Sequence, residues 1–209
     1  MPSQIYFVTL RSETIDKNMI MEKENYIEIH VGISPEVQWY QDLMERMKGL
    51  KVNRIIRRCH VTAVFLKDDG LKDALTEAFD RQLHHRSALR LTFDKLEAFT
   101  SISGKEHIVC VTSTHPETEF VELVEGLRGE AARLGAELED SYRLHVTLVR
   151  VPVDAISLEE LQQLIAGIPM PAFTLALTTV DYRYRMSDLK AGLIKEWKLK
   201  ESFHGSVCK

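Results

Sequence analysis

Two stretches decide the expected fold: His60-Val61-Thr62-Ala63-Val64 and, 85 residues further on, His145-Val146-Thr147-Leu148-Val149. Both are rich in β-branched residues, which favours a strand. Side chains alternate between the two faces of a strand, so the histidine and the threonine of each stretch share one face. The valine between them points to the other face. Each strand is therefore expected to present one imidazole and one hydroxyl side by side.

Helical and strand patterns follow in a similar order around both stretches. The expected helices run over 34–49, 70–84, 116–135 and 157–165, the last opening on a Ser157–Glu160 capping box. The expected strands run over 5–10, 26–31, 59–66, 89–99, 108–112, 143–151, 173–184 and 193–199. This order is a weak internal duplication, which predicts an α+β protein with two similar lobes.

Composition narrows the class of protein. The chain has 209 residues, of which 44% are hydrophobic and 28% charged, as in an ordinary globular domain. A net charge of −4 argues against a protein that coats long nucleic acid, but a small anionic ligand needs only a local positive site. The sequence has no membrane-spanning run and no signal-peptide pattern, so we expect a cytoplasmic monomer.

The sequence contains no pattern typical of a metal or cofactor site. The three cysteines, Cys59, Cys110 and Cys208, are scattered and lack the spacing of zinc ligands. No glycine-rich phosphate loop is present. We therefore expect no metal and no cofactor, and any chemistry is expected to come from side chains.

If the two strands meet, two imidazoles and two hydroxyls surround one cavity. A neutral imidazole can take a proton from water or from a 2′-hydroxyl, and an imidazolium can protonate a leaving oxygen. Threonine hydroxyls can donate hydrogen bonds to the non-bridging oxygens of a phosphate. One His-x-Thr on a strand is common and usually structural, but two copies in matching positions favour a phosphodiester site.

The pair of motifs resembles the 2H phosphoesterase superfamily, and His145-Val146-Thr147-Leu148-Val149-Arg150 is similar to the HxTLxR form of its RNA-ligase-like branch. The resemblance implies a bilobal fold with two antiparallel sheets, flanking helices and a central cleft that carries one HxT strand from each lobe. It implies that His60 and His145 are the acid and the base, with Thr62 and Thr147 as phosphate ligands. Our hypothesis is that His145 is the base and His60 the acid.

The chain also departs from that family. Cys59 and Leu144 stand where proline is frequent, and Ala63 stands where leucine is frequent. The residues before Tyr26 look like an addition. We therefore divide the chain into an N-terminal extension over 1–25, a 2H-like domain over 26–199 and a C-terminal tail over 200–209.

The remaining candidates depend on which way each side chain points. Arg58 belongs to a basic cluster before His60, which is either a solvated loop or an electropositive rim. Arg150 is a candidate phosphate ligand, although strand alternation places it opposite His145 unless the strand bends. Tyr142 and Tyr182 either stack on a base or pack in the core. His30 is a further candidate for the cleft, Phe65 is expected in the core, and His107 is expected in a loop or at the surface.

The expected function is a metal-independent phosphodiesterase that opens a 2′,3′-cyclic phosphate on an RNA end or a nucleotide. A second possibility keeps the site and changes the substrate to 2′-5′ oligoadenylate or a cyclic oligonucleotide. A third is a module that binds a nucleotide such as AMP without turnover. If the two HVT strands are a coincidence, His60 and His145 are expected to lie far apart.

Overall fold

The computed structural model describes residues 23–66, 70–138, 143–186 and 191–200. Within them the chain forms α1 (Gln38–Met47), α2 (Lys72–Leu83), α3 (Thr118–Arg133) and α4 (Leu158–Ala166). The strands are β1 (Lys23–His30), β2 (Arg54–Ile55), β3 (His60–Leu66), β4 (Leu89–Phe93), β5 (Lys95–Thr100), β6 (Glu106–Thr112), β7 (Val146–Pro152), β8 (Phe173–Leu177), β9 (Thr179–Met186) and β10 (Ala191–Lys198). The expected α+β class is confirmed.

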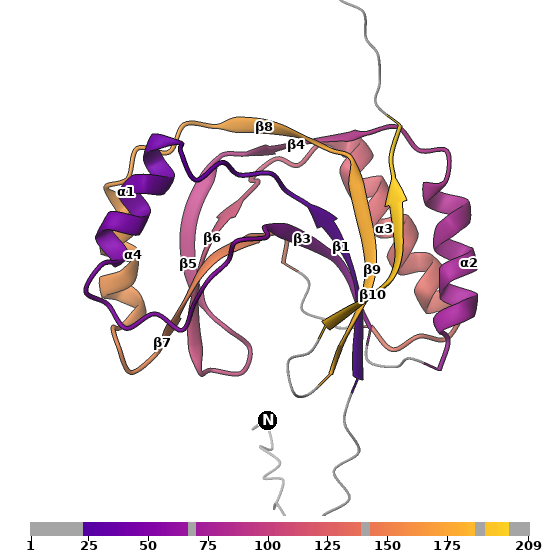
Figure 1. The fold of residues 1–209 in the computed structure, drawn as a ribbon, viewed down its shortest axis with the longest axis horizontal. Coiled ribbons are helices and arrows are strands. Elements are labelled where there is room, and N and C mark those ends of the chain that lie inside the picture. The colour runs from indigo at the N-terminus through magenta and orange to yellow at the C-terminus, as the bar shows by residue number, and fades with distance from the viewer. Residues whose placement is uncertain (1–22, 67–69, 139–142, 187–190, 201–209) are drawn as a thin grey trace, which may run out of the picture.

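The strands form two antiparallel sheets, also as expected. The large sheet has the order β10-β9-β1-β3-β7-β6-β5, with β2 paired to β7, and the small sheet consists of β4 and β8. Figure 1 shows the large sheet as an arch with β3 near its middle, α1 and α4 beside one end, and α2 and α3 beside the other. The small sheet crosses the convex side of the arch.

The division of strands between the sheets differs from the expectation. Both HVT strands, β3 and β7, belong to the large sheet and are neighbours in it. Their pairing is limited to Val61 and Val146, so the sheet is narrowly joined at its centre. The two halves of the arch correspond to the expected lobes, but a continuous sheet connects them.

Two expected long strands each break into two, and this creates the small sheet. The run over 89–99 turns at Asp94, so that β4 leaves the large sheet and β5 stays in it. The run over 173–184 breaks at Thr178 in the same way, and β8 pairs with β4 along its whole length. Each half of the chain thus contributes one strand to the small sheet, which extends the internal duplication.

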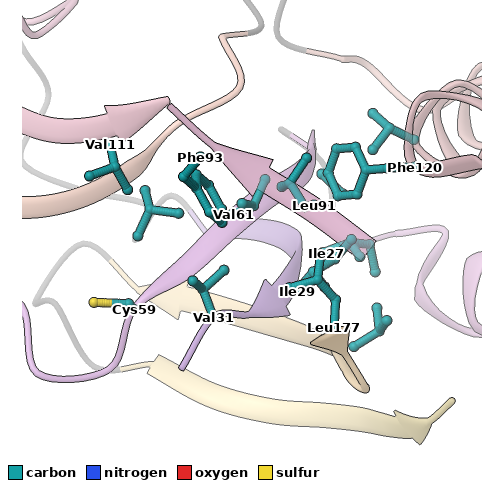
Figure 2. Packing of buried hydrophobic residues seen from close by; sticks show 14 of the residues in the cluster. Ile27, Ile29, Val31, Cys59, Val61, Leu91, Phe93, Val111, Phe120 and Leu177 are labelled. Atoms are coloured by element: carbon teal, nitrogen blue, oxygen red, sulfur yellow. The ribbon is translucent and has the colours of Figure 1, made fainter. Parts of the chain in front are cut away.

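The core fills the space between the convex face of the large sheet, the small sheet and the helices. Ile27 and Ile29 of β1, Val61 of β3, and Leu91 and Phe93 of β4 are fully buried there. Figure 2 shows their side chains meeting between the sheets. Burial of each such side chain contributes roughly 1.5–3 kcal/mol. The core therefore holds the backbones of the two HVT strands from behind, while their histidines and threonines face the concave side.

Each HVT strand contains a β-bulge directly after its motif. Ala63 is passed over in the register of β3 with β1, and Leu148 is passed over in the register of β7 with β6. A bulge shifts the alternation of side chains by one residue. Phe65 and Arg150 consequently return to the face of their motif's histidine and threonine. The expectations of a core Phe65 and of an Arg150 opposite His145 are both wrong for this reason.

His107 was expected in a loop or at the surface, but it is buried in β6. Its ring nitrogens contact the hydroxyl of Thr100 and the carbonyl of Ile156.

The large sheet begins at Lys23, three residues inside the proposed extension. The strand expected over 5–10 lies outside the described residues. In the part of the chain that the structure describes, no helix is long and apolar enough to cross a membrane.

The capping box of α4 is present, and it predicts a stability effect. The Ser157 hydroxyl accepts a hydrogen bond from the Glu160 backbone N–H, and the Glu160 carboxylate accepts one from Ser157 N–H. Ser157→Ala is expected to lower the free energy of unfolding by about 1 kcal/mol, measured by urea denaturation. Ser157→Thr, which keeps a hydroxyl, serves as the control. An unchanged urea midpoint in the alanine variant would contradict a stabilising cap.

Candidate active site

A cavity of about 1000 Å³ opens on the concave face of the large sheet. Its lining includes His60 and Thr62 of β3, Thr147 of β7, and His145 immediately before β7. The two HVT motifs therefore meet at one site, as the motif pair predicts. Chance strands in unrelated places would not share a cavity.

The four motif side chains are related by an approximate twofold arrangement. Val61 pairs with Val146 across antiparallel strands, and both valines are fully buried. The antiparallel direction places His60 beside Thr147 and Thr62 beside His145 on the opposite, concave face. Because neighbouring strands lie about 4.8 Å apart, each imidazole has a hydroxyl from the other motif next to it.

The two imidazoles are held in the same way. Nδ1 of His60 lies 3.3 Å from the Arg58 carbonyl oxygen, and Nδ1 of His145 lies 2.8 Å from the Arg143 carbonyl oxygen. Each contact joins a histidine to the residue two positions before it. Since a carbonyl only accepts, Nδ1 must carry the proton, and a neutral ring keeps a lone pair on Nε2. Both rings can thus exchange a proton with a substrate through Nε2.

The fold and this cavity have counterparts among solved structures. A complex of E. coli LigT with 3′-AMP gives a TM-score of 0.58 at 20% identity, covering 86% of this chain and 98% of LigT. A crystal structure of a phosphoesterase gives 0.57 at 19% identity over 85% and 99% of the two chains. Usb1 of Kluyveromyces marxianus gives 0.54 at 8% identity over 84% and 98%.

These neighbours all belong to the 2H phosphoesterase superfamily. The chain has the 2H phosphoesterase fold. The sequence itself gives no match to family models, and a search of curated proteins finds none either. At these identities the fold is what the chains share, so the chemistry of this cavity depends on the residues that line it.

Burial lowers the pKa of both histidines below the usual histidine value. For His60 the lowering by burial is opposed first by the negative charge of Glu28 and then by the Arg58 carbonyl. For His145 it is opposed by the Arg143 carbonyl, while the positive charges of Arg143 and Arg150 add to the lowering. Both imidazoles therefore favour the neutral form near pH 7, although the charged groups beside them differ.

Arginine dominates the charge of the cavity. Of the described residues that line it, one is acidic, Glu28, whereas seven are arginines: Arg54, Arg57, Arg58, Arg128, Arg143, Arg150 and Arg183. A chain with a net charge of −4 thus has a strongly positive site. Such a concentration of guanidinium groups attracts an anionic ligand and can bind phosphate oxygens in pairs.

Two of these arginines stand near the second motif. Arg150, on the cavity side because of the bulge, forms an ion pair with Glu106 at 3.1 Å. Arg143 forms an ion pair with Glu97 at 2.7 Å and lies 4.2 Å above the centroid of the Phe99 ring. The two carboxylates restrain the guanidinium groups of Arg143 and Arg150. Each guanidinium group has further N–H donors that can bind a ligand.

Glu28, His30 and Asp181 form a cluster beside His60, and their ligand atoms lie within 4.8 Å of one another. That geometry would suit a metal ion. However, Arg58 Nη2 lies 2.6 Å and Arg183 Nη1 lies 3.0 Å from Asp181 Oδ2. Two guanidinium charges already neutralise the two carboxylates, so the cluster is an ion-pair network with no net negative charge left to attract a divalent cation.

The outcome for the weaker candidates is mixed. Arg58 lines the cavity. His30 lies on the same face of β1 as Glu28 and is half-buried. Its Nε2 lies 3.1 Å from Asp181 Oδ2, and the residue is not part of the cavity lining. The prediction that Tyr182 lies in the cavity is wrong. Its side chain is fully buried and its ring packs edge-on against Phe79, with 5.7 Å between centroids. Tyr142 lies outside the described residues.

An aromatic pair that the sequence analysis missed lines the cavity instead. Tyr26 of β1 and Phe65 of β3 are register partners, and their rings are stacked with centroids 6.1 Å apart and an angle of 13°. Arg183 of β9 is the register partner of Tyr26 on its other side. Tyr26 and Glu28 could have been found from strand alternation, since they share a face with the candidate His30. Phe65 was hidden by the bulge.

Proposed function

We propose that the chain is a metal-independent phosphodiesterase that opens a 2′,3′-cyclic phosphate on an RNA end or a nucleotide. The observation that carries the proposal is the twofold set of His60, Thr62, His145 and Thr147 around one positive cavity. In this reaction one neutral imidazole takes a proton from water as the water oxygen bonds to phosphorus. The other imidazole, protonated, gives its proton to the ribose oxygen that leaves, and the product is a phosphomonoester.

The threonines and arginines have complementary roles in this proposal. Thr62 and Thr147 donate hydrogen bonds to the non-bridging oxygens, where negative charge grows in the transition state. The guanidinium groups, Arg150 among them, balance the charge of the phosphate and of the product. Because the two histidines supply both proton transfers, the mechanism needs no metal ion.

The similar solved structures support a nucleotide as the ligand. Complexes of E. coli LigT with 3′-AMP, with phosphate, with ATP and with NADP⁺ are known. The cavity of this chain offers two kinds of contact that a nucleotide needs. One is a phosphate site between the motifs, and the other is the Tyr26–Phe65 pair, on which a base can stack.

The arginines favour one second candidate. Four of the seven lining arginines form ion pairs, but their further N–H donors and the other three arginines together exceed what a single phosphate engages. An oligonucleotide with several phosphates, such as 2′-5′ oligoadenylate or a cyclic oligonucleotide, is therefore a second candidate substrate. The same two-histidine chemistry applies to it. A module that binds AMP without turnover needs the stacking pair and the arginines but no pair of histidines.

A substrate screen with excess chelator tests the proposal. The purified chain is incubated with nucleoside 2′,3′-cyclic phosphates, RNA with a cyclic phosphate end, 2′-5′ oligoadenylate and cyclic dinucleotides, and the products are separated by chromatography. Turnover of a cyclic phosphate that chelator leaves unchanged is the expected result. Turnover of the oligonucleotides alone favours the second candidate. Binding without turnover, or loss of turnover with chelator, would contradict the mechanism.

The stacking pair predicts a change in KM. Phe65→Ala removes half of the pair and is expected to raise KM for a nucleoside cyclic phosphate roughly tenfold, with little change in kcat, because stacking on an aromatic contributes about 1–3 kcal/mol per base. Phe65→Tyr keeps the ring and is the control. A ribose 2′,3′-cyclic phosphate without a base should show no effect of Phe65→Ala; an equal rise in its KM would exclude base stacking.

A further inference from the structure

The two halves of the site match in backbone and differ in charge. Both histidines donate from Nδ1 to the carbonyl two residues before them, and both motifs are followed by a bulge. His60 has a buried carboxylate, Glu28, beside it. Among the residues that the structure describes, no carboxylate forms an ion pair with His145. The twofold arrangement is therefore broken by the Glu28 carboxylate, which has no counterpart in an ion pair with His145 in the described part of the chain.

Glu28 is held so that one of its oxygens faces the imidazole. It lies on β1 as the register partner of Thr62, and its side chain is 4% exposed. Oε2 lies 3.5 Å from His60 Nδ1, whereas Oε1 lies 3.3 Å from Arg58 Nη2 and 3.6 Å from Arg183 Nε. The two guanidinium groups pair with this buried carboxylate and hold its other oxygen toward His60.

The Nδ1 proton of His60 thus has two acceptors nearby, the Arg58 carbonyl at 3.3 Å and the Glu28 carboxylate at 3.5 Å. An adjacent negative charge favours the imidazolium over the neutral ring. The charged and titratable groups that act on His60 are Glu28 and His30 of β1, Arg58 before β3 and His145 before β7. Asp181 and Arg183 of β9 lie behind them, where Asp181 pairs with His30, Arg58 and Arg183.

His145 lies in the opposite kind of surroundings. The Phe99 ring meets it edge-on at 5.2 Å between centroids, and the Arg143 guanidinium lies over the Phe99 ring, 4.2 Å from its centroid. Arg143 and Arg150 both disfavour a positive charge on the imidazole. The neutral ring, which can accept a proton, is the favoured form here.

We propose that Glu28 is a positioning residue for His60, which makes His60 the proton donor to the leaving oxygen and leaves His145 to act as the base. This inference rests on the proposed function and names Glu28 as the residue that distinguishes the hypothesised acid, His60, from the hypothesised base, His145. The Nε2 proton of the His60 imidazolium passes to the leaving ribose oxygen as its bond to phosphorus breaks. The proton of the attacking water passes to Nε2 of His145, and exchange with solvent restores both rings.

Glu28→Gln tests the proposal because it removes the charge and keeps the shape. The parent and the variant are compared on two cyclic phosphate substrates, one with an oxygen and one with a sulfur at the leaving position. A thiolate leaves without protonation, so only the oxygen substrate needs the acid. On that substrate the alkaline limb of kcat/KM should move to lower pH, with kcat/KM at pH 8 falling roughly tenfold or more. On the sulfur substrate the change should stay below about twofold.

Glu97→Gln is the matched control, since it makes the same chemical change on the side of His145 without contacting that ring. It should leave the alkaline limb on the oxygen substrate in place. Equal losses on both substrates, or an alkaline limb that Glu28→Gln does not move, would overturn the proposal. If Glu28→Gln does not fold, Glu28→Asp is the second variant. Its shorter side chain keeps a negative charge near Arg58 and Arg183 but moves the carboxylate away from His60, so the alkaline limb should still shift to lower pH.

A histidine NMR titration separates this proposal from the proposed function. Glu28→Gln should lower the pKa of His60 and leave the pKa of His145 in place, whether or not a substrate is turned over. A parent that cleaves no phosphodiester but shows this selective shift would refute the proposed function alone. A parent that is active while its His60 pKa does not respond to Glu28→Gln would refute the role of Glu28 alone.

Discussion

Replacement of either His60 or His145 with alanine is expected to lower kcat on a cyclic phosphate by a factor of roughly 100 or more. Each ring lines the cavity and keeps Nε2 for the substrate, so each is expected to carry one of the two proton transfers. Loss of a positioned general acid or base lowers rates by about 10²–10⁴-fold. Single-turnover rates measured by chromatography would give this factor for both variants.

The pH dependence of kcat/KM provides a second measurement on the same variants. The base must be neutral, so the rate rises as pH passes through the pKa of that histidine. The acid must be protonated, so the rate falls as pH passes through the pKa of the other. Burial lowers the pKa of both histidines below the ordinary histidine value of 6.5, so the maximum of the bell is expected below that pH.

Each single variant should lose one limb of the bell, the acid limb in His145→Ala and the alkaline limb in His60→Ala. His115→Ala, which changes an exposed histidine away from the cavity, is the control and should keep both limbs. A parental bell in His60→Ala and His145→Ala, or a loss below about fivefold in both, would remove the two histidines from the mechanism.

The sequence predicts those features of the structure that depend on residues close together in the chain. The faces of His60 and Thr62 follow from alternation within one strand, and the capping box at Ser157 follows from residues three apart. Alternation fails at Arg150 because a bulge is a property of the pairing with β6, which the sequence of β7 alone does not encode. Register between strands is set by contacts far apart in the chain.

Glu28 shows the same limit more sharply. Its importance arises because β1 pairs with β3 on one side and with β9 on the other, which brings together residues 28, 60 and 181. Tyr182 was misplaced for the same reason. It pairs with Ile27, whose side chain is in the core, so its ring follows Ile27 inward while Arg183 beside it faces the cavity. Alternation within β1 gives the face of Glu28, but its contact with His60 and the inward direction of Tyr182 cannot be derived without the strand order.

The second large effect is expected from the threonines. Thr62→Val and Thr147→Val replace a hydroxyl with a methyl group of the same shape, so packing on the partly exposed cavity face changes little. Each variant removes one donor to the non-bridging oxygens. Loss of one such donor costs about 10²–10³ in kcat in comparable sites, and we expect a fall of roughly that size for each threonine. Thr→Ser at the same positions restores a hydroxyl and is the control.

The distribution of this loss between kcat and KM decides what the threonines do. If they stabilise charge that develops in the transition state, kcat falls and KM stays nearly constant. If they only anchor the ground-state phosphate, KM rises and kcat is preserved. The antiparallel arrangement sets each hydroxyl beside the histidine of the other motif, so the two single variants should resemble each other. A fall in kcat in only one of the two valine variants would show that Thr62 and Thr147 have different roles in the reaction despite the twofold arrangement of the backbone.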